Sequence, residues 1–255
     1  MLFPWMMLRP ILVTLLLTLT LLTGCSKGPV QVPPAGKLKE QKSGIHRLTA
    51  KVPGVGDVKY ALEVPNNYDG QSRVPLVMIL HYGYQGARPD PYTGADMMDA
   101  FRSGLGDLGA ILVAPDALGG DWTSTDNEKA VAWLTQSIIK TYKIDTKKVI
   151  LTGYSLGGEG TWFIGSRHQK LFTAAIPVAA PVAGADVKWQ IPVYVIHSNR
   201  DQVVSHSTAK SHAEKLQRKG AKVQFQTVQG LDHYATGQYG GYLQDGVSWV
   251  QSQWK

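Results

Sequence analysis

The sequence predicts an α/β protein with a mostly parallel central sheet and helices on both faces. Short apolar runs rich in β-branched residues alternate with longer amphipathic stretches. The middle runs are apolar throughout, as is typical of parallel strands buried on both faces. The chain has 255 residues, of which 44% are hydrophobic and 18% charged, so it can form one domain with a complete core.

Seven runs are expected to be strands, and they cover residues 58–64, 74–81, 110–115, 148–153, 174–179, 192–197 and 223–228. The first run is followed closely by the second, so we expect it to lie antiparallel at an edge of the sheet. Helical periodicity extends over residues 127–142, 207–219 and 242–253. A further helix is expected directly after residue 155.

The N-terminus has the features of an export signal. The apolar run at residues 11–22 is shorter than the ~20 residues that span a bilayer and suits a signal peptide. It ends in Leu-Thr-Gly-Cys at 22–25, which resembles the lipobox of bacterial lipoproteins. The resemblance implies cleavage before Cys25, acylation of Cys25, and attachment to a membrane of the bacterial cell envelope, on the periplasmic or outer-membrane side. An uncleaved N-terminal anchor is the alternative.

Three regions follow from this reading. Residues 1–24 are the predicted signal peptide, and residues 25–44, rich in Pro, Gly and Lys, are expected to be an acylated cysteine and a flexible tether. Residues 45–255 are the predicted folded domain. Cys25 is the only cysteine, so no disulfide forms within the chain. The net charge is +7, but the basic residues are scattered and no nucleic-acid motif is present, so we expect no nucleic-acid partner.

The segment Gly-Tyr-Ser-Leu-Gly at 153–157 carries the strongest catalytic signal. It follows a predicted strand directly and precedes a helical stretch, the context of a G-x-S-x-G nucleophile elbow. Glycines two residues before and after the serine leave room for the tight turn. The turn places Ser155 at the positive end of the following helix. Ser155 is the predicted nucleophile; a glycine-rich turn with an inert serine is the alternative.

A serine hydroxyl needs a base, and the base needs an orienting carboxylate. After a nucleophile elbow the expected chain order is Ser, then Asp or Glu, then His. Asp201 follows the strand at 192–197 and is the predicted acid; Asp186, before that strand, is a weaker candidate. His233 follows the last strand and is the predicted base, with Asp232 expected to support its loop. The other histidines after Ser155 are expected to be structural: His168, His197, His206 and His212.

Two backbone N–H groups are expected to form an oxyanion hole. One belongs to Leu156, and the other to the loop at 80–86, where Tyr82 is the first choice and Gly83 the second. Three aromatic residues at strand ends are predicted to bind substrate, with packing of the last two as the alternative: Tyr84, Trp122 and Tyr154. Only a short segment separates the strands at 174–179 and 192–197, so we expect an open site without a large cap domain.

Four segments carry a family resemblance: PLVMILHYG, ILVAPDALGGDW, VILTGYSLGGEGTWFIGSRH and PVYVIHSNRDQVV. Together they resemble esterases of the α/β-hydrolase fold, in the phospholipase/carboxylesterase and feruloyl-esterase-like group, over residues 58–249. The resemblance implies cleavage of carboxylic esters through an acyl-enzyme, without a metal or organic cofactor. Ser155 is expected to separate the chain from the dienelactone hydrolases, whose nucleophile is cysteine.

The open site suits short-chain esters or esters carried on a polymer. Two other classes of function compete with an esterase. A serine peptidase of the prolyl-oligopeptidase type has the same catalytic domain but usually an additional large domain. A non-enzymatic binding lipoprotein would be expected to lack a triad residue, and this chain has all three.

Overall fold

The computed structural model describes residues 28–83, 92–183 and 187–254. Within these ranges one eight-stranded sheet has the order β1-β2-β4-β3-β5-β6-β7-β8. The strands are β1 (Gly44–Val52), β2 (Gly56–Val64), β3 (Val74–Leu80), β4 (Ile111–Pro115), β5 (Ile144–Tyr154), β6 (Ala174–Val178), β7 (Val193–Ser198) and β8 (Val223–Val228). β2 pairs antiparallel with both β1 and β4, and all other neighbouring strands are parallel.

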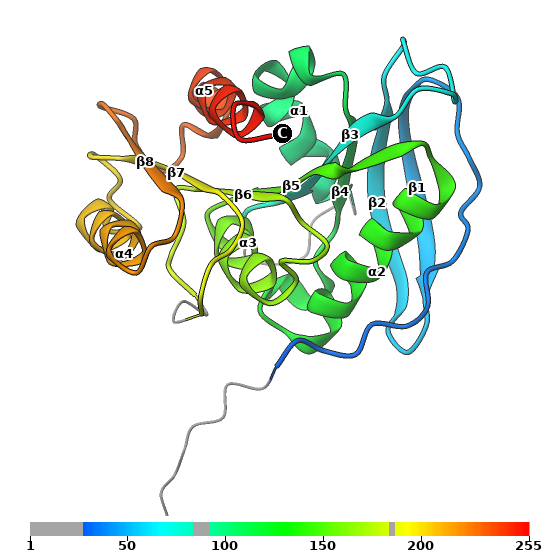
Figure 1. Cartoon of the computed structure of the whole chain (residues 1–255), viewed down its shortest axis with the longest axis horizontal. Coiled ribbons are helices and arrows are strands. Elements are labelled where there is room, and N and C mark those ends of the chain that lie inside the picture. The colour runs from blue at the N-terminus through cyan, green and yellow to red at the C-terminus, as the bar shows by residue number, and fades with distance from the viewer. Residues whose placement is uncertain (1–27, 84–91, 184–186, 255) are drawn as a thin grey trace, which may run out of the picture.

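Helices cover both faces of this sheet. They are α1 (Thr93–Leu105), α2 (Thr125–Thr141), α3 (Leu156–Arg167), α4 (His206–Arg218) and α5 (Gly240–Gln251), with short 3-10 turns η1 (Gly106–Leu108), η2 (Leu118–Gly120) and η3 (Thr236–Tyr239). α1 and α5 lie on one face and α2, α3 and α4 on the other (Figure 1). Serine side chains cap α2 and α4, where Ser124 and Ser205 accept from backbone amides of the first turn.

The sheet separates two apolar layers. Along β3 the side chains alternate between them, because successive residues of a strand point to opposite faces. Leu76, Met78 and Leu80 pack with residues of α2 and α3, whereas Val77 and Ile79 pack with residues of α1 and α5. All five are completely buried. This doubly covered, mostly parallel sheet confirms the predicted fold class.

All seven predicted strands are present, with shifts of a few residues at their ends. The strand predicted at 58–64 is antiparallel as expected, but its place at the edge is wrong. The edge strand is β1, which the sequence pattern did not reveal. α1 was also not predicted.

Residues 28–43, here called the N-terminal strap, run along α2 and β1 (Figure 1). Backbone amides of the strap donate to side chains near or on α2, as Gly36 does to Ser137 Oγ at 3.1 Å and Leu38 does to Thr141 Oγ1 at 2.9 Å. The Trp133 indole N–H donates to the Pro34 carbonyl at 3.1 Å. The prediction of a flexible tether is therefore wrong for this segment, because side chains of α2 bind its backbone.

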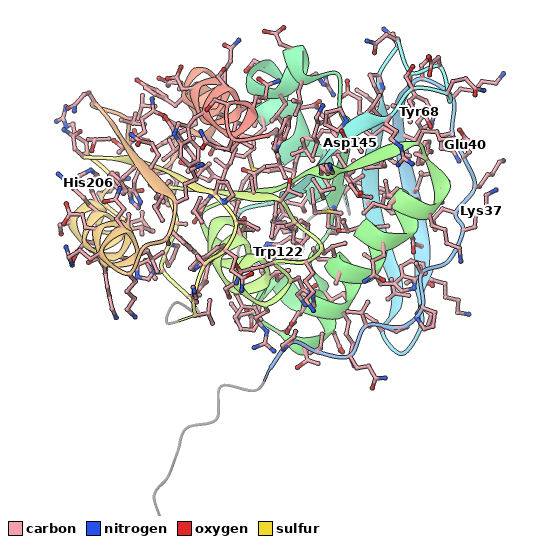
Figure 2. The ribbon with its side chains drawn as sticks, viewed as in Figure 1. Lys37, Glu40, Tyr68, Trp122, Asp145 and His206 are labelled. Carbon is pink, nitrogen blue, oxygen red and sulfur yellow. The ribbon has the colours of Figure 1, made fainter. Side chains whose placement is uncertain are left out.

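The outer side of the strap is polar. Lys37 and Glu40 are exposed and extend away from the domain in Figure 2, whereas Val32 and Leu38 pack against the core. Cys25 and the predicted signal peptide lie outside the described residues. In the part of the chain that the structure describes, no helix combines the length and the apolarity needed to cross a membrane.

Candidate active site

The turn between β5 and α3 has a strained backbone at one residue. Ser155 has φ 53° and ψ −118°, a region that residues with a side chain rarely adopt. Two hydrogen bonds hold it: the Ser155 amide donates to the Val178 carbonyl at 3.0 Å, and the Ser155 carbonyl accepts from the Glu159 amide at 2.9 Å. This turn places the serine side chain between the end of β5 and the start of α3.

The glycines around Ser155 are required by close backbone packing. A Cβ atom at position 157 would overlap the carbonyl oxygen of Leu80, at the end of β3. At position 153 a Cβ would overlap the Gly157 carbonyl, and at position 158 it would lie 2.5 Å from the Ala180 Cβ. The glycines therefore let α3 begin in contact with both neighbouring strands, as the elbow pattern predicts.

Three side chains from distant parts of the sequence form one hydrogen-bonded chain. His233 Nε2 lies 2.9 Å from Ser155 Oγ, and His233 Nδ1 lies 2.8 Å from Asp201 Oδ2. The Asp201 carboxylate is completely buried. With a proton on Nδ1 donated to Asp201, the Nε2 lone pair accepts the serine hydroxyl proton, which is the arrangement that activates a serine nucleophile.

The loop after β8 carries His233 and is tied to its surroundings. The Ser198 hydroxyl donates to the Leu231 carbonyl at 2.5 Å, and the His233 amide donates to Gln202 Oε1 at 3.2 Å. The Tyr154 hydroxyl donates to the His233 carbonyl at 2.7 Å. These bonds hold the imidazole between the other two side chains.

His197 lies beside the buried carboxylate. Its Nε2 donates to the Val204 carbonyl at 3.0 Å and lies 3.4 Å from Asp201 Oδ2. Burial, as the main cause, lowers the pKa of His197, so this histidine is neutral at neutral pH. The sequence pattern indicated a structural residue here; its contact with the acid becomes visible only in the structure.

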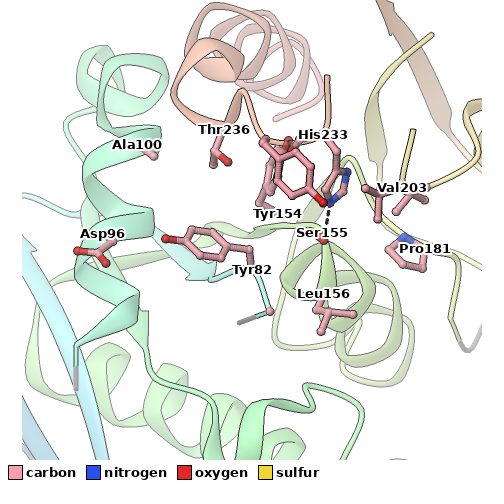
Figure 3. A pocket seen from close by; sticks show the side chains of 13 residues that line it. Tyr82, Asp96, Ala100, Tyr154, Ser155, Leu156, Pro181, Val203, His233 and Thr236 are labelled. Atoms are coloured by element: carbon pink, nitrogen blue, oxygen red, sulfur yellow. Dashed lines mark hydrogen bonds between the residues drawn. The ribbon is translucent and has the colours of Figure 1, made fainter. Parts of the chain in front are cut away.

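An open cavity of about 940 Å³ lies in front of Ser155 (Figure 3). Its lining residues are Tyr82, Gly83, Asp96, Ala100, Tyr154, Ser155, Leu156, Pro181, Val203, Val204, His233, Tyr234 and Thr236. In Figure 3 the Tyr82 ring extends from the Ser155 side toward Asp96, while Val203 and Pro181 lie on the opposite side of the serine. Asp96 and Ala100 were not predicted because they lie on α1, which the sequence pattern did not reveal. Thr236, at the start of η3, was not predicted either.

The two predicted oxyanion donors both border this cavity. Leu156 is the first residue of α3, and amides of a first helical turn have no acceptor within the helix. The loop after β3 reaches Leu156 as well, because a Cβ at Gly83 would overlap the Leu156 side chain. His81 fixes that loop: its Nδ1 donates to the Tyr82 carbonyl at 2.6 Å, and its Nε2 accepts from the Ala117 amide at 2.9 Å.

Comparison with known proteins places the chain in a family. A sequence profile of the dienelactone hydrolase family matches residues 78–241, more than half of the chain. The chain belongs to the dienelactone hydrolase family. The expectation that Ser155 excludes this family is wrong, because the match extends over β3 to α5 and tolerates serine at the elbow.

Several individual relatives are named as esterases or serine hydrolases. A probable feruloyl esterase C of Aspergillus niger is 24% identical over 216 residues, which cover 82% of this chain and 76% of the relative. A crystal structure of a thermostable esterase has a TM-score of 0.66 and 25% identity, covering 82% of this chain and 62% of that chain. The structure of XC6422 from Xanthomonas campestris, an α/β serine hydrolase without lid, has a TM-score of 0.64 and 19% identity. The match covers 84% of this chain and 97% of XC6422. This member of the family is a hydrolase of carboxylic esters with the α/β-hydrolase fold.

Of the predicted substrate-binding residues, Trp122 does not line the cavity. It is 2% exposed, its indole N–H donates to the His81 carbonyl at 2.8 Å, and it packs against Gly160 of α3. The prediction for Trp122 is wrong, since its side chain turns into the core rather than toward the serine. Tyr154 borders the cavity but is only 1% exposed, and Tyr84 lies outside the described residues.

Other polar residues have structural partners. The His168 ring donates to the buried Glu128 carboxylate at 2.8 Å, and the His206 ring lies 3.0 Å from Thr227 Oγ1. Asp186, the weaker candidate for the acid, lies outside the described residues. Across the described ranges no cluster of three or more His, Cys, Asp or Glu side chains could hold a metal ion.

Proposed function

We propose that this protein cleaves carboxylic esters through an acyl-enzyme on Ser155. The observation that carries the proposal is the hydrogen-bonded chain from Ser155 through His233 to Asp201, which opens into the cavity. Ser155 Oγ attacks the ester carbonyl carbon while its proton passes to His233 Nε2. The tetrahedral intermediate then collapses, His233 returns that proton to the leaving alcohol oxygen, and the acyl group stays on Ser155.

Deacylation uses the same residues in reverse. A water molecule gives a proton to His233 Nε2 and attacks the acyl carbon, and the collapse of this second intermediate returns the proton to Ser155 Oγ. Asp201 stabilises the imidazolium that forms in both halves. The N–H groups of Leu156 and Tyr82 are proposed to bind the oxyanion, Leu156 from the positive end of α3.

The surroundings of the serine support short-chain or carrier-linked esters as substrates. The described residues between β6 and β7 contain no helix, so no helical lid is built there. Four large hydrophobic side chains are exposed in the described part of the chain, and three of these border the cavity: Leu156, Val203 and Tyr234. An open cleft with an apolar rim accepts a small acyl group while the rest of a bulky substrate stays outside. The feruloyl esterase name of the Aspergillus niger relative supports an aromatic acyl group among those accepted.

Hydrolysis of p-nitrophenyl acetate, butyrate and octanoate by a protein that starts near Lys27 tests this proposal. We expect turnover that is highest on the short chains and that falls by at least ~10³-fold in Ser155→Ala. Ser211→Ala, an exposed serine on α4, is the matched control and should keep wild-type activity. A fluorophosphonate probe should label the wild type and not Ser155→Ala. No hydrolysis and no labelling of the wild type would contradict the proposal.

We also propose that the domain is held at a bacterial envelope membrane through acylated Cys25. The lipobox-like segment before Cys25 supports cleavage and acylation there. Two residues, Ser26 and Lys27, separate Cys25 from Gly28, so the three Cα–Cα steps of this link span at most about 11 Å when fully extended. Cys25→Ser should move the protein from the membrane fraction to the soluble fraction.

A further inference from the structure

Tyr154 precedes the nucleophile in the sequence and also contacts the loop of the base. Its hydroxyl donates to the His233 backbone carbonyl at 2.7 Å, and the two rings have centroids 5.6 Å apart. We propose that Tyr154 is a positioning residue that sets the place of His233 relative to Ser155. This inference rests on the proposed esterase function, since it assigns a residue to the same reaction.

The tyrosine ring is rigidly packed, so its hydroxyl has a defined position. The side chain is 1% exposed and belongs to the core layer of α1 and α5. Its ring contacts Tyr239 edge-on at 5.2 Å and Phe101 at 6.4 Å between centroids. Burial, as the main cause, raises the pKa of Tyr154, so the hydroxyl keeps its proton and acts as a donor throughout the working range.

The bond closes a short path between the two reacting groups. Ser155 and Tyr154 are adjacent in the chain. The hydrogen bond from the Tyr154 hydroxyl therefore links the His233 backbone to the same turn that carries the nucleophile. On the other side, the His233 amide donates to the side chain of Gln202 in the loop that carries Asp201, and the Ser198 hydroxyl donates to the carbonyl of Leu231, two residues before His233. The imidazole must lie within hydrogen-bond distance of both partners, and Tyr154 supplies the constraint on the nucleophile side.

Loss of the hydroxyl should therefore affect catalysis and not only folding. Without Tyr154 Oη the His233 carbonyl is left buried and unpaired, which favours movement of the loop away from the elbow. A displacement of about 1 Å at a catalytic group costs up to ~10²-fold in rate. A purely structural tyrosine would instead lower stability while each folded molecule kept its full turnover rate.

The test is Tyr154→Phe, which keeps the ring and removes only the hydroxyl. Tyr194→Phe is the matched control, because Tyr194 is a buried tyrosine of the same core layer on β7 and does not border the cavity. Both variants are assayed on p-nitrophenyl acetate at a temperature where thermal unfolding shows them to be fully folded. We expect Tyr154→Phe to lower kcat by roughly 10- to 100-fold with KM within about twofold of wild type. The rate of fluorophosphonate labelling of Ser155 should fall in parallel.

The possible results separate the two proposals. Wild-type kcat in Tyr194→Phe together with a reduced kcat in Tyr154→Phe supports the positioning role. A kcat within about twofold of wild type for folded Tyr154→Phe overturns that role and leaves the esterase function standing. An inactive, unlabelled wild type overturns both.

Discussion

At the scale of single residues, the two carboxylate oxygens of Asp201 have different partners. Oδ1 accepts the backbone amides of Val203 at 2.9 Å and Val204 at 2.8 Å. Oδ2 accepts from His233 Nδ1 at 2.8 Å and faces His197 Nε2 at 3.4 Å. The two amides fix the carboxylate in its rotamer. The second oxygen is thereby aimed at the imidazole, and it holds the tautomer in which Nε2 is free to accept a proton.

Asp201→Asn should therefore inactivate the enzyme without unfolding it. The amide oxygen can take the place of Oδ1 while the NH₂ group faces His233 Nδ1, which forces the imidazole proton onto Nε2. We expect kcat on p-nitrophenyl acetate to fall by ~10⁴-fold, the size of effect that the wrong tautomer has in other triads. Asp232→Asn is the control, because this carboxylate accepts from the Tyr234 amide on the exposed side of the loop. Similar activity in the two variants would contradict the assignment of Asp201.

The sequence predicted the three side chains of the hydrogen-bonded chain better than the residues around them. Ser155 was recognisable because a strained turn imposes glycines at fixed positions, and Asp201 and His233 because they follow strands that end at the same edge of the sheet. The direction of a side chain has no such signature. Trp122 follows a strand end as Asp201 and His233 do, yet its indole points into the core, where its N–H donates to the His81 carbonyl.

At the scale of elements, two features were missed for different physical reasons. β1 has polar residues along an exposed edge, so its Gly-Ile-His-Arg-Leu-Thr-Ala-Lys-Val pattern lacks the apolar continuity of the inner strands. α1 contains Gly94 and Gly104, which normally disfavour a helix. Here a Cβ at Gly94 would overlap the Ala114 carbonyl, and one at Gly104 would overlap the Gly240 carbonyl. The glycines serve close packing of α1 on β4 and α5, which a single sequence does not show.

The N-terminal strap was predicted to be flexible because its composition does not reveal the side chains of α2 that bind its backbone. Glu128 in the first turns of α2 is one of them, and its side chain is 1% exposed. Its Oε1 accepts from the Val30 amide at 3.1 Å, from Arg167 Nε at 2.8 Å and from His168 Nε2 at 2.8 Å. Glu128 thus joins the strap, α2 and the end of α3 at one buried carboxylate.

Glu128→Gln should lower stability in a pH-dependent way. Burial raises the pKa of Glu128, but the hydrogen bonds from His168 and Arg167 outweigh burial and hold the pKa below its ordinary value of 4.5. The stabilisation of the fold by ionised Glu128 is therefore complete above pH 4.5, the ordinary pKa that applies in the unfolded chain. It is lost as the pH falls through the lower pKa that Glu128 has in the folded state. We expect the variant to have a free energy of unfolding roughly 1–3 kcal/mol below wild type at pH 7, with a smaller difference at acidic pH.

Urea unfolding at neutral and acidic pH measures this difference. Asp126→Asn removes the same charge from the same helical turn, but Asp126 is exposed, so the control should change stability by less than ~0.5 kcal/mol. An equal deficit of Glu128→Gln at both pH values would show that the lost carboxylate charge is not the cause.

At the scale of the whole molecule, the residues of the candidate active site lie at one edge of the sheet. Ser155 follows β5, Asp201 follows β7, His233 follows β8, and the loop with Tyr82 follows β3. All four strands are parallel, so their carboxyl ends meet at one edge, where ligands of such sheets bind. The strap instead lies along α2 and β1, and none of its residues borders the cavity. The proposed attachment through Cys25 and the proposed catalysis at Ser155 therefore involve separate parts of the molecule.

This separation predicts the behaviour of Cys25→Ser. Without the thiol we expect no incorporation of an alkyne-tagged fatty acid and a shift from the membrane fraction to the soluble fraction. The strap starts at Gly28 and keeps its bonds to α2, so kcat and KM on p-nitrophenyl acetate should stay within about twofold of wild type. Ser26→Ala is the control and should remain labelled and membrane-bound, because it leaves the thiol in place. Fatty-acid labelling that persists in Cys25→Ser would place the lipid on another residue and refute the lipobox assignment.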